Sequence, residues 1–256
     1  MRAAAVGQQC VDCVSQGVQG TRSARTVFGG RPAAGAVVTW TLVAINVALY
    51  LVIWVRPSIV NNLEMLGYAP YGGAVHGVAA GEWYRLITSA FVVPGAGLGG
   101  LGFLDILFNM WALIFVGPAL EGFLGRLRFL SVYLLSAIGG AVMYYYLAPR
   151  YQFAAGASGA IYGLFGAWFV VSRRLRLDTR GIVALIAINL AFSFYFRGTI
   201  AWQDHIGGLL TGALLTAAYA YAPRRYRAAT QVLATAAVVT ALVIAIAIRN
   251  GQLTTA

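Results

Sequence analysis

Seven apolar runs divide the 256-residue sequence, and each is close to the length that a helix needs to cross a lipid bilayer. The hydrocarbon core of a bilayer is about 30 Å thick, which about 20 helical residues span. The runs lie at about residues 36–55, 104–120, 129–148, 157–172, 181–197, 203–221 and 231–248. Hydrophobic residues make up 60% of the chain and charged residues only 10%, which excludes an ordinary water-soluble domain. The sequence therefore predicts an all-α polytopic membrane protein.

The charged residues between these runs predict the orientation of the chain. All 18 basic residues are arginines, against 7 acidic residues. Thirteen arginines fall on the side of the membrane that holds the N-terminus, and five fall on the other side, namely Arg56, Arg85, Arg150, Arg197 and Arg249. Because cytoplasmic connections are enriched in arginine, we expect a cytoplasmic N-terminus and an outer C-terminus in a plasma membrane. This topology accounts for the basic excess without a nucleic-acid partner.

The apolar runs also divide the chain into three parts. Residues 1–35 are polar and glycine-rich and are predicted to form a cytoplasmic tail. The tail contains Cys10 and Cys13 at a spacing that suits zinc, but a structural zinc site needs four ligands and the sequence has no other cysteine. We therefore expect two reduced thiols and no bound metal. Residues 36–222 are predicted to form a core of six transmembrane helices, and residues 223–256 a seventh, C-terminal transmembrane helix.

One serine and one histidine stand out among the polar residues of the apolar runs. Ser158 is followed by Gly159 and Gly163, and His205 is followed by Gly208 and Gly212 on one helical face. Small residues let helix backbones approach closely. If the two runs pack together, the serine and the imidazole come within reach of each other, as a nucleophile and its base require. Taken singly, the serine is better explained as a small packing residue and the histidine as a satisfied core residue.

The position of Ser158 within its run is also informative. The run has about 16 residues, which form a helix about 24 Å long, shorter than the hydrocarbon core. If its arginine-flanked end lies at the cytoplasmic face, Ser158 lies at a helix N-terminus inside the membrane. The unbonded N–H groups and the positive dipole end found there suit a developing oxyanion. Asp204 precedes His205 but points about 100° away from it in a helix, so we predict a Ser–His dyad.

The connection from Arg56 to about Phe103 is much longer than the others. It contains the sequence GEWYR, which ends at Arg85, and later the glycine-rich run PGAGLGGLG. We expect the aromatic rings and a snorkelling Arg85 guanidinium to lie at the membrane interface.

Four motifs of the chain resemble those of the rhomboid family of intramembrane serine proteases. They are GASG with Ser158, HIGGLLTG with His205, GEWYR in the first outer loop, and FNMWALIFVGPALE in the second span. The ordered set extends from about Trp40 to Tyr221. The resemblance implies a rhomboid-like six-helix core and the cleavage of transmembrane segments of membrane proteins in the lipid bilayer, without a cofactor.

The resemblance also implies roles for single residues. Ser158 is implied as the nucleophile, His205 as its general base, Tyr162 as a ring stacked on the histidine, and Asn109 as an oxyanion-binding amide. The remaining matches are implied to support the structure or the site, and they are Gly156, Gly208, Gly212, Arg85 and Glu121. The N-terminal tail resembles the last part of a zinc-binding segment that some bacterial rhomboids carry.

One position departs from the family pattern. Many rhomboids have a histidine four residues before the asparagine, where it helps to bind the oxyanion, whereas this sequence has Asp105. An ionised carboxylate accepts hydrogen bonds, donates none, and repels an oxyanion. Either burial keeps Asp105 protonated so that it donates, or its side chain turns away. Because loss of one oxyanion donor costs about 10²- to 10³-fold in rate, we predict slow catalysis rather than none.

The sequence therefore predicts a serine endopeptidase that acts by acyl transfer on membrane-protein substrates. The alternative is a non-catalytic rhomboid-like protein that binds transmembrane clients, a hypothesis that Asp105 favours. A transporter or channel is less favoured than either, because the runs show no clear inverted repeat.

Overall fold

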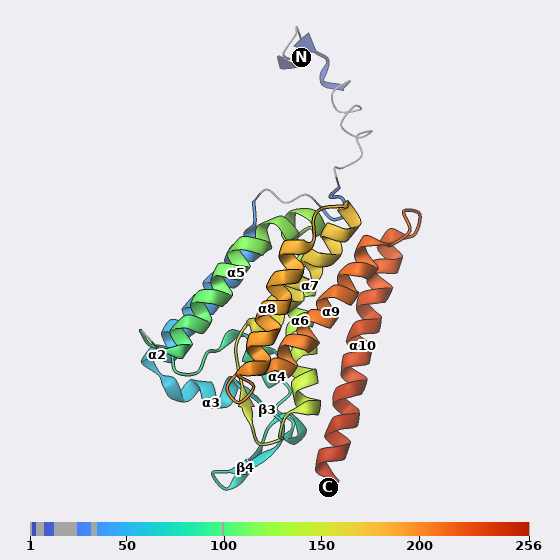
Figure 1. Ribbon diagram of the computed structural model, residues 1–256. Helices are drawn as coiled ribbons and strands as arrows, with labels where there is room; N and C mark the ends of the chain where they lie inside the picture. The colour runs from blue at the N-terminus through green and yellow to red at the C-terminus, as the bar shows by residue number, and fades with distance from the viewer. Residues whose placement is uncertain (1, 4–7, 13–24, 32–34, 99, 256) are drawn as a thin grey trace.

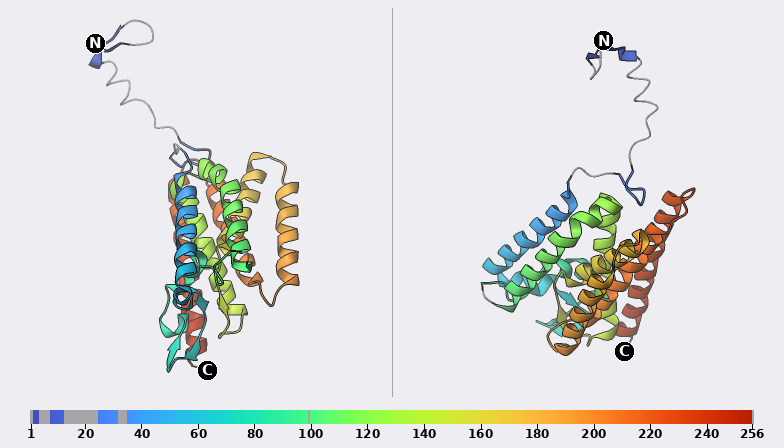
Figure 2. Two further views of the ribbon diagram at one scale, coloured as in Figure 1. Left: turned by 90° about the vertical axis from the view of Figure 1, so that its left-hand side faces the viewer. Right: turned by 45° about the horizontal axis from the view of Figure 1, so that its top comes forward.

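The computed structural model describes residues 2–3, 8–12, 25–31, 35–98 and 100–255 (Figure 1). In this part of the chain, seven long helices run alternately between the two ends of the molecule (Figures 1 and 2). They are α2 (Val37–Val55), α5 (Leu101–Leu124), α6 (Arg126–Leu147), α7 (Ser158–Leu175), α8 (Arg180–Tyr195), α9 (Trp202–Ala220) and α10 (Arg227–Thr254). Each predicted apolar run overlaps one of these helices. The predicted all-α fold is confirmed.

Within the described residues, four helices are long and apolar enough to cross a membrane, namely α2, α5, α6 and α10. The apolar helix α8 is shorter. The other two, α7 and α9, are rich in glycine and alanine, and most of α7 is buried among its neighbours (Figure 2). A helix inside a bundle contacts protein instead of lipid, so close packing matters more to it than apolar surface.

The contact between α7 and α9 is as close as glycine permits. A Cβ atom on Gly208 would collide with the carbonyl oxygen of Gly159, and one on Gly212 would collide with that of Gly163. On another side, Gly163 contacts Ser136 of α6. These are the glycines that the sequence predicted to face each other. The expected contact between the two runs is therefore present.

The first turn of α2 is capped by a residue from another helix. The preceding residue, Ala36, has no side chain that can bond the N–H groups of a helix start. Glu121, near the end of α5, accepts hydrogen bonds from the amides of Val38 (3.0 Å) and Thr39 (2.9 Å) and from the Thr39 hydroxyl (2.9 Å). A carboxylate in this position also interacts favourably with the helix dipole. Glu121 thus ties α5 to α2.

The long connection between α2 and α5 folds into short elements at one end of the molecule (Figure 1). They are 3-10 turns at Pro57–Ile59, Val78–Ala80 and Ser89–Phe91, α3 (Val60–Leu63), β3 (Met65–Leu66), β4 (Ala69–Tyr71), β5 (Ala74–His76) and α4 (Arg85–Thr88). The strand β4 pairs antiparallel with β5, and β3 pairs antiparallel with β6 (Phe153–Ala154). The connection is thereby attached to the segment that leads into Ser158. In the N-terminal segment, β1 (Arg2–Ala3) pairs antiparallel with β2 (Gln8–Gln9).

Arg85 holds this connection together. Its side chain is fully buried. Its Nε donates to the Glu82 carboxylate at 2.6 Å, and its Nη1 donates to the carbonyl oxygens of Asn61 (2.9 Å) and Glu64 (2.8 Å). The sequence predicted that Arg85 snorkels to the membrane interface, and this prediction was wrong. The guanidinium is buried because the carbonyl groups of the connection, turned inward, need a donor.

Glu82 is the acidic partner of Arg85. Its carboxylate also accepts a hydrogen bond from the Gly77 amide at 2.6 Å and lies 3.0 Å from Nδ1 of His76. Burial disfavours the ionised form, but the hydrogen bonds from His76, Gly77 and Arg85 outweigh it and lower the pKa of Glu82. The carboxylate is therefore ionised at neutral pH and balances the charge of Arg85.

The last helix, α10, lies along α6 and α9 (Figure 1). Near its end, Arg249 donates to the carbonyl oxygens of Tyr145 (3.1 Å) and Tyr146 (3.4 Å) of α6. The Tyr145 hydroxyl in turn donates to Oδ1 of Asn250 at 2.6 Å. Little of α10 is buried, which suits a helix with lipid on most sides.

Replacing Gly208 by alanine tests the close packing of α7 and α9. The added methyl group would overlap the Gly159 carbonyl, so we expect the free energy of unfolding to fall by about 1–3 kcal/mol. Thermal unfolding of the purified protein in detergent measures this loss. Gly122→Ala is the matched control, because Gly122 also lies in a helix and nothing in the described structure comes within 4 Å of an added methyl group. Equal stability of the two variants would contradict the packing role of Gly208.

Candidate active site

Ser158 and His205 lie at the starts of two adjacent helices. Ser158 is the first residue of α7, as the sequence predicted, and His205 lies in the first turn of α9. The contact between Gly159 and Gly208 sits beside both residues and keeps them near each other. His205 is buried, and Ser158 is partly buried. Among the hydrogen bonds of the described residues, none joins the two side chains.

The imidazole of His205 is held by a stacked tyrosine. The ring of Tyr162, one turn after Ser158, lies parallel to the imidazole, with 4.1 Å between ring centroids and 12° between the planes. The resemblance implied this stack, and the structure contains it. Stacking restricts the imidazole to rotation within its own plane.

A second contact, a hydrogen bond with Ser193, orients the imidazole of His205 through Nδ1. Ser193 of α8 is buried, and its Oγ lies 2.8 Å from Nδ1 of His205 and 3.2 Å from the Tyr162 hydroxyl. The Ser193 hydroxyl is also placed to donate to the carbonyl oxygen of Asn189, at 2.8 Å. If the one hydrogen of this hydroxyl goes to the Asn189 carbonyl, Ser193 accepts a hydrogen bond from Nδ1–H of His205. In that arrangement the imidazole hydrogen is on Nδ1 and the lone pair is on Nε2, as a general base requires.

Sequence reasoning did not single out Ser193. It is the one buried residue of α8, whose other side chains are at least partly exposed. A usable signal existed in the four-residue spacing of Asn189 and Ser193, two polar residues on one face of an otherwise apolar helix. The sequence could not show that this face meets His205, because that contact depends on how α8 packs.

Asp105 faces the serine instead of turning away from it. A Cβ atom built on Gly156 would lie 3.3 Å from Oδ2 of Asp105 and 3.6 Å from Oγ of Ser158, so the carboxylate and the hydroxyl border the same small space. Asn109, one turn later on α5, donates from Nδ2 to the carbonyl oxygen and to Oδ1 of Asp105, both at 2.9 Å. The amide that the resemblance assigns to the oxyanion is thus bonded to Asp105.

Gly156 shapes the backbone that leads into the serine. Its φ of +134° is one that residues with a Cβ atom rarely adopt, and its amide donates to the Ser89 carbonyl at 2.9 Å. This turn directs the chain into α7. The first N–H groups of that helix have no partner within the helix.

A family model described as the Rhomboid domain matches residues 80–222, which is more than half of the chain. The matched region contains α5 to α9 and with them Ser158 and His205. The chain belongs to the rhomboid family of intramembrane proteases.

Three relatives show how far this similarity reaches. YdcA of Bacillus subtilis, which is named among the rhomboid proteases, is 36% identical over 178 residues that cover 68% of this chain and 85% of YdcA. Rhomboid protease GluP of Bacillus subtilis is 32% identical over 179 residues, which cover 68% of this chain and 33% of GluP. Rhomboid protease AarA of Providencia stuartii is 26% identical over 208 residues, which cover 68% of this chain and 69% of AarA. The chain therefore matches most of YdcA and AarA but only a third of GluP.

In this rhomboid, the Asp204 carboxylate lies between two helices and not on the imidazole of its neighbour His205. It contacts Gly140 of α6 and Gly159 of α7, and the Gly159 amide donates a hydrogen bond to it. Because Gly159 follows Ser158, the carboxylate binds one of the first N–H groups of the serine helix. Asp204 therefore caps α7, and the task of orienting His205 falls to Ser193 and Tyr162.

No group of three or more His, Cys, Asp or Glu side chains that could hold a metal ion occurs in the described part of the chain. Cys10 is exposed there, whereas Cys13, the other cysteine of the tail, lies outside the described residues. The interpretation of the tail as the end of a zinc-binding segment stays a prediction.

Ser193→Ala tests the assignment of the imidazole hydrogen. Without the hydroxyl, the buried Nδ1–H has no acceptor, which costs about 1–3 kcal/mol and lets the other tautomer form. We therefore expect a fluorophosphonate probe to modify Ser158 about tenfold more slowly. The control Asn189→Ala keeps the backbone carbonyl that Ser193 bonds and should react at the rate of the unaltered protein. If Ser193→Ala also reacts at that rate throughout the neutral pH range, Ser193 does not orient the ring.

Proposed function

We propose that this rhomboid cleaves peptide bonds in transmembrane segments of membrane proteins with a dyad of Ser158 and His205. One observation carries the proposal. Ser158 begins α7, the helix whose Tyr162 stacks on the imidazole of His205, and Ser193 makes a hydrogen bond with Nδ1 of that imidazole. A serine next to an oriented base at a helix N-terminus is the arrangement that acyl transfer requires.

The proposed reaction has two steps. In the first, Nε2 of His205 takes the proton of Ser158 as Oγ attacks the carbonyl carbon of the substrate, and the imidazolium then protonates the leaving amine. In the second, a water molecule attacks the acyl-enzyme with His205 again as the base, and Ser158 is released. The imidazolium is stabilised by Ser193, which accepts from Nδ1–H, and by the face of Tyr162. No metal ion or organic cofactor takes part.

The oxyanion is the demanding part of this mechanism. The backbone N–H of Ser158 and the side-chain amide of Asn109 are its proposed donors. In the structure, Nδ2 of Asn109 makes two hydrogen bonds to Asp105, so it must release at least one of them to bind the oxyanion. The Asp105 carboxylate also borders the space next to Ser158. This competition supports slow turnover.

The same competition is the observation that favours the second candidate function, a non-catalytic rhomboid that binds transmembrane clients. The presence of both Ser158 and His205, and the two contacts that orient the imidazole, favour the protease. A site that only binds clients has no need of an oriented imidazole lone pair.

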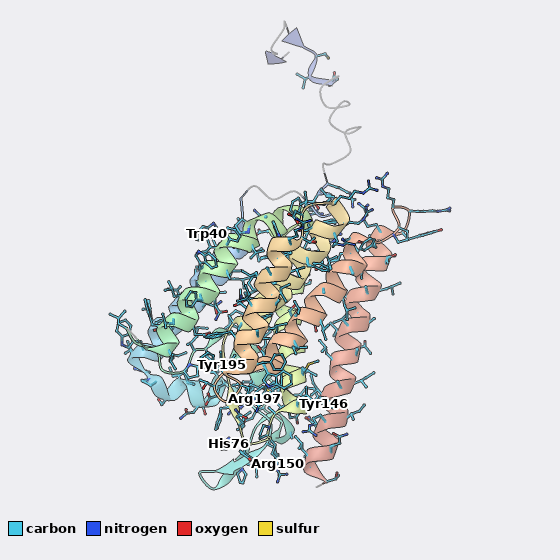
Figure 3. All side chains as sticks on the ribbon, in the orientation of Figure 1. Trp40, His76, Tyr146, Arg150, Tyr195 and Arg197 are labelled. Atoms are coloured by element: carbon cyan, nitrogen blue, oxygen red, sulfur yellow. The ribbon has the colours of Figure 1, made fainter. Side chains whose placement is uncertain are left out.

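The proposed organisation follows the helices. The family match ends at residue 222, just before α10, which supports a rhomboid core at residues 36–222 and an additional helix at residues 223–256. The chain is a multi-pass membrane protein. Trp40 lies at one end of the molecule, and Arg150 and Arg197 lie at the other (Figure 3). The arginine-rich end that includes the N-terminus of α10 is proposed to face the cytoplasm, which puts the C-terminus outside.

The decisive experiment compares cleavage by the purified protein and its variants in liposomes with a fluorescent model transmembrane substrate. We expect Ser158→Ala and His205→Ala to lower the cleavage rate by at least about 10³-fold. Ser172→Ala is the matched control, because Ser172 is a buried serine at the far end of the same helix. Equal cleavage by the protein and Ser158→Ala would refute the dyad. Absence of cleavage across several substrates, with client binding intact, would establish the non-catalytic alternative.

Asp105→His tests whether the carboxylate handicaps the oxyanion site. The substitution removes the negative charge, releases Nδ2 of Asn109 from its bond to Oδ1 and adds a donor, so we expect kcat to rise about 10- to 100-fold. Asp105→Asn removes the charge at constant size and should give a smaller gain. Cleavage of the same substrate measures both variants. A lower rate in both would show that the carboxylate contributes to the reaction.

A further inference from the structure

Three arginines line a cavity between the ends of α7 and α9 and the start of α10. Figure 1 shows these helix ends at the same end of the bundle. The cavity has a volume of about 370 Å³. Arg174 comes from the end of α7, Arg224 from the connection between α9 and α10, and Arg227 is the first residue of α10. In the described part of the chain, no aspartate or glutamate lines it. The cavity is therefore strongly positive, and it is remote from the proposed catalytic residues.

The arginines of this cavity have donors to spare. Nε of Arg227 is buried and has no hydrogen-bond partner among the described residues. Within the described residues, its Nη1 donates to the Val27 carbonyl alone, at 3.4 Å. Arg174 uses its Nε on the Ala220 carbonyl at 3.2 Å, and its two Nη groups make no hydrogen bond within the described structure. Buried donors nearly always have an acceptor, which Nε of Arg227 lacks, and a ligand with several acceptor oxygens can also bind the Nη groups of the exposed Arg174.

The cavity wall is fixed by contacts outside it. Gln231 of α10 donates from Nε2 to the carbonyl oxygens of Phe28 and Tyr219, both at 3.0 Å, and accepts from Nε of Arg128 at 2.7 Å. These bonds join α6, α9, α10 and the segment before α2. The site is therefore preformed.

The acidic side chains at this end are engaged elsewhere. Glu121 accepts hydrogen bonds from Val38 and Thr39, and Asp178 accepts one from the amide of Arg180. Within the described residues, neither carboxylate neutralises the cavity.

The surroundings of the cavity favour a lipid over a small solute. Tyr221 lines it and Tyr226 directly precedes Arg227, and both are exposed, as aromatic residues at the headgroup level of a membrane are. Farther along α10, Val232 and Leu233 are 67% and 68% exposed and give this helix an apolar surface for acyl chains. We propose that the cavity binds the phosphate of an anionic phospholipid headgroup, which bridges the ends of α7 and α10.

The experiment measures binding without reference to proteolysis. Thermal unfolding of the full chain in neutral detergent is followed while short-chain phosphatidylglycerol is added, with short-chain phosphatidylcholine, glycerol 3-phosphate and inorganic phosphate in parallel. We expect phosphatidylglycerol to raise the unfolding temperature in a saturable manner and the other three to have little effect. In the variant Arg174→Gln, Arg224→Gln, Arg227→Gln, the apparent affinity for phosphatidylglycerol should fall at least about tenfold.

The matched control removes the same charge from the same end of the molecule. Its substitutions are Arg173→Gln, Arg180→Gln and Arg225→Gln, all at exposed arginines that do not line the cavity. We expect this control to keep its affinity within about threefold. Equal losses in the two triple variants, or an equal shift with phosphatidylcholine, would overturn the proposal. A full shift with inorganic phosphate or glycerol 3-phosphate would replace the lipid by a soluble phosphate.

A single substitution keeps the proposal testable if the triple variant does not fold. Arg224 is exposed and makes no hydrogen bond in the described structure, so Arg224→Gln removes one guanidinium without disturbing the helices. Loss of one arginine should weaken phosphatidylglycerol binding about fivefold. Unchanged binding by Arg224→Gln would exclude the cavity as the headgroup site.

Discussion

The rest of this structure depends on the contact between α7 and α9. Glycines on both helices bring the backbones so close that a single methyl group on Gly208 would overlap the Gly159 carbonyl. Lipid supplies no hydrophobic force that drives two helices together, so this packing must come from close van der Waals contact. Ser158 is the first residue of α7 and His205 lies in the first turn of α9. The distance between these two residues is therefore set by the glycines. The Asp204 carboxylate strengthens the same junction by capping α7.

The imidazole is oriented by three helices at once. His205 comes from α9, its stacking partner Tyr162 from α7, and its hydrogen-bond partner Ser193 from α8. A hydroxyl thus takes the orienting position that a carboxylate holds in a Ser-His-Asp triad. Within a membrane protein this choice has a physical advantage, because a neutral hydroxyl orients the ring without the desolvation cost of a buried charge. Ser193 remains fully engaged through the Asn189 carbonyl.

The sequence predicted much of the fold because its signals are local. Apolar runs of membrane-spanning length gave the helices, and the spacing of Gly208 and Gly212 gave the face of α9 that packs closely. The interpretation of Arg85 as a snorkelling residue failed for a reason that is not local. Its partners include the carbonyl oxygens of Asn61 and Glu64, more than 20 residues earlier, and only the folded connection brings these together. Ser193 was missed for the same reason, because its contact with His205 forms only when α8 packs against α9.

By itself, the sequence determined that the chain crosses a membrane, where its helices lie, and that Ser158 begins a short helix, since hydropathy and helix length depend only on neighbouring residues. The tertiary structure decided that Nδ1 of His205 bonds to Ser193 and that Asp105 faces Ser158 while holding Asn109. It also brought Arg174 and Arg227 to one cavity. Each of these depends on how one helix is rotated against another. That rotation is fixed by packing among residues far apart in the chain, which no local pattern records.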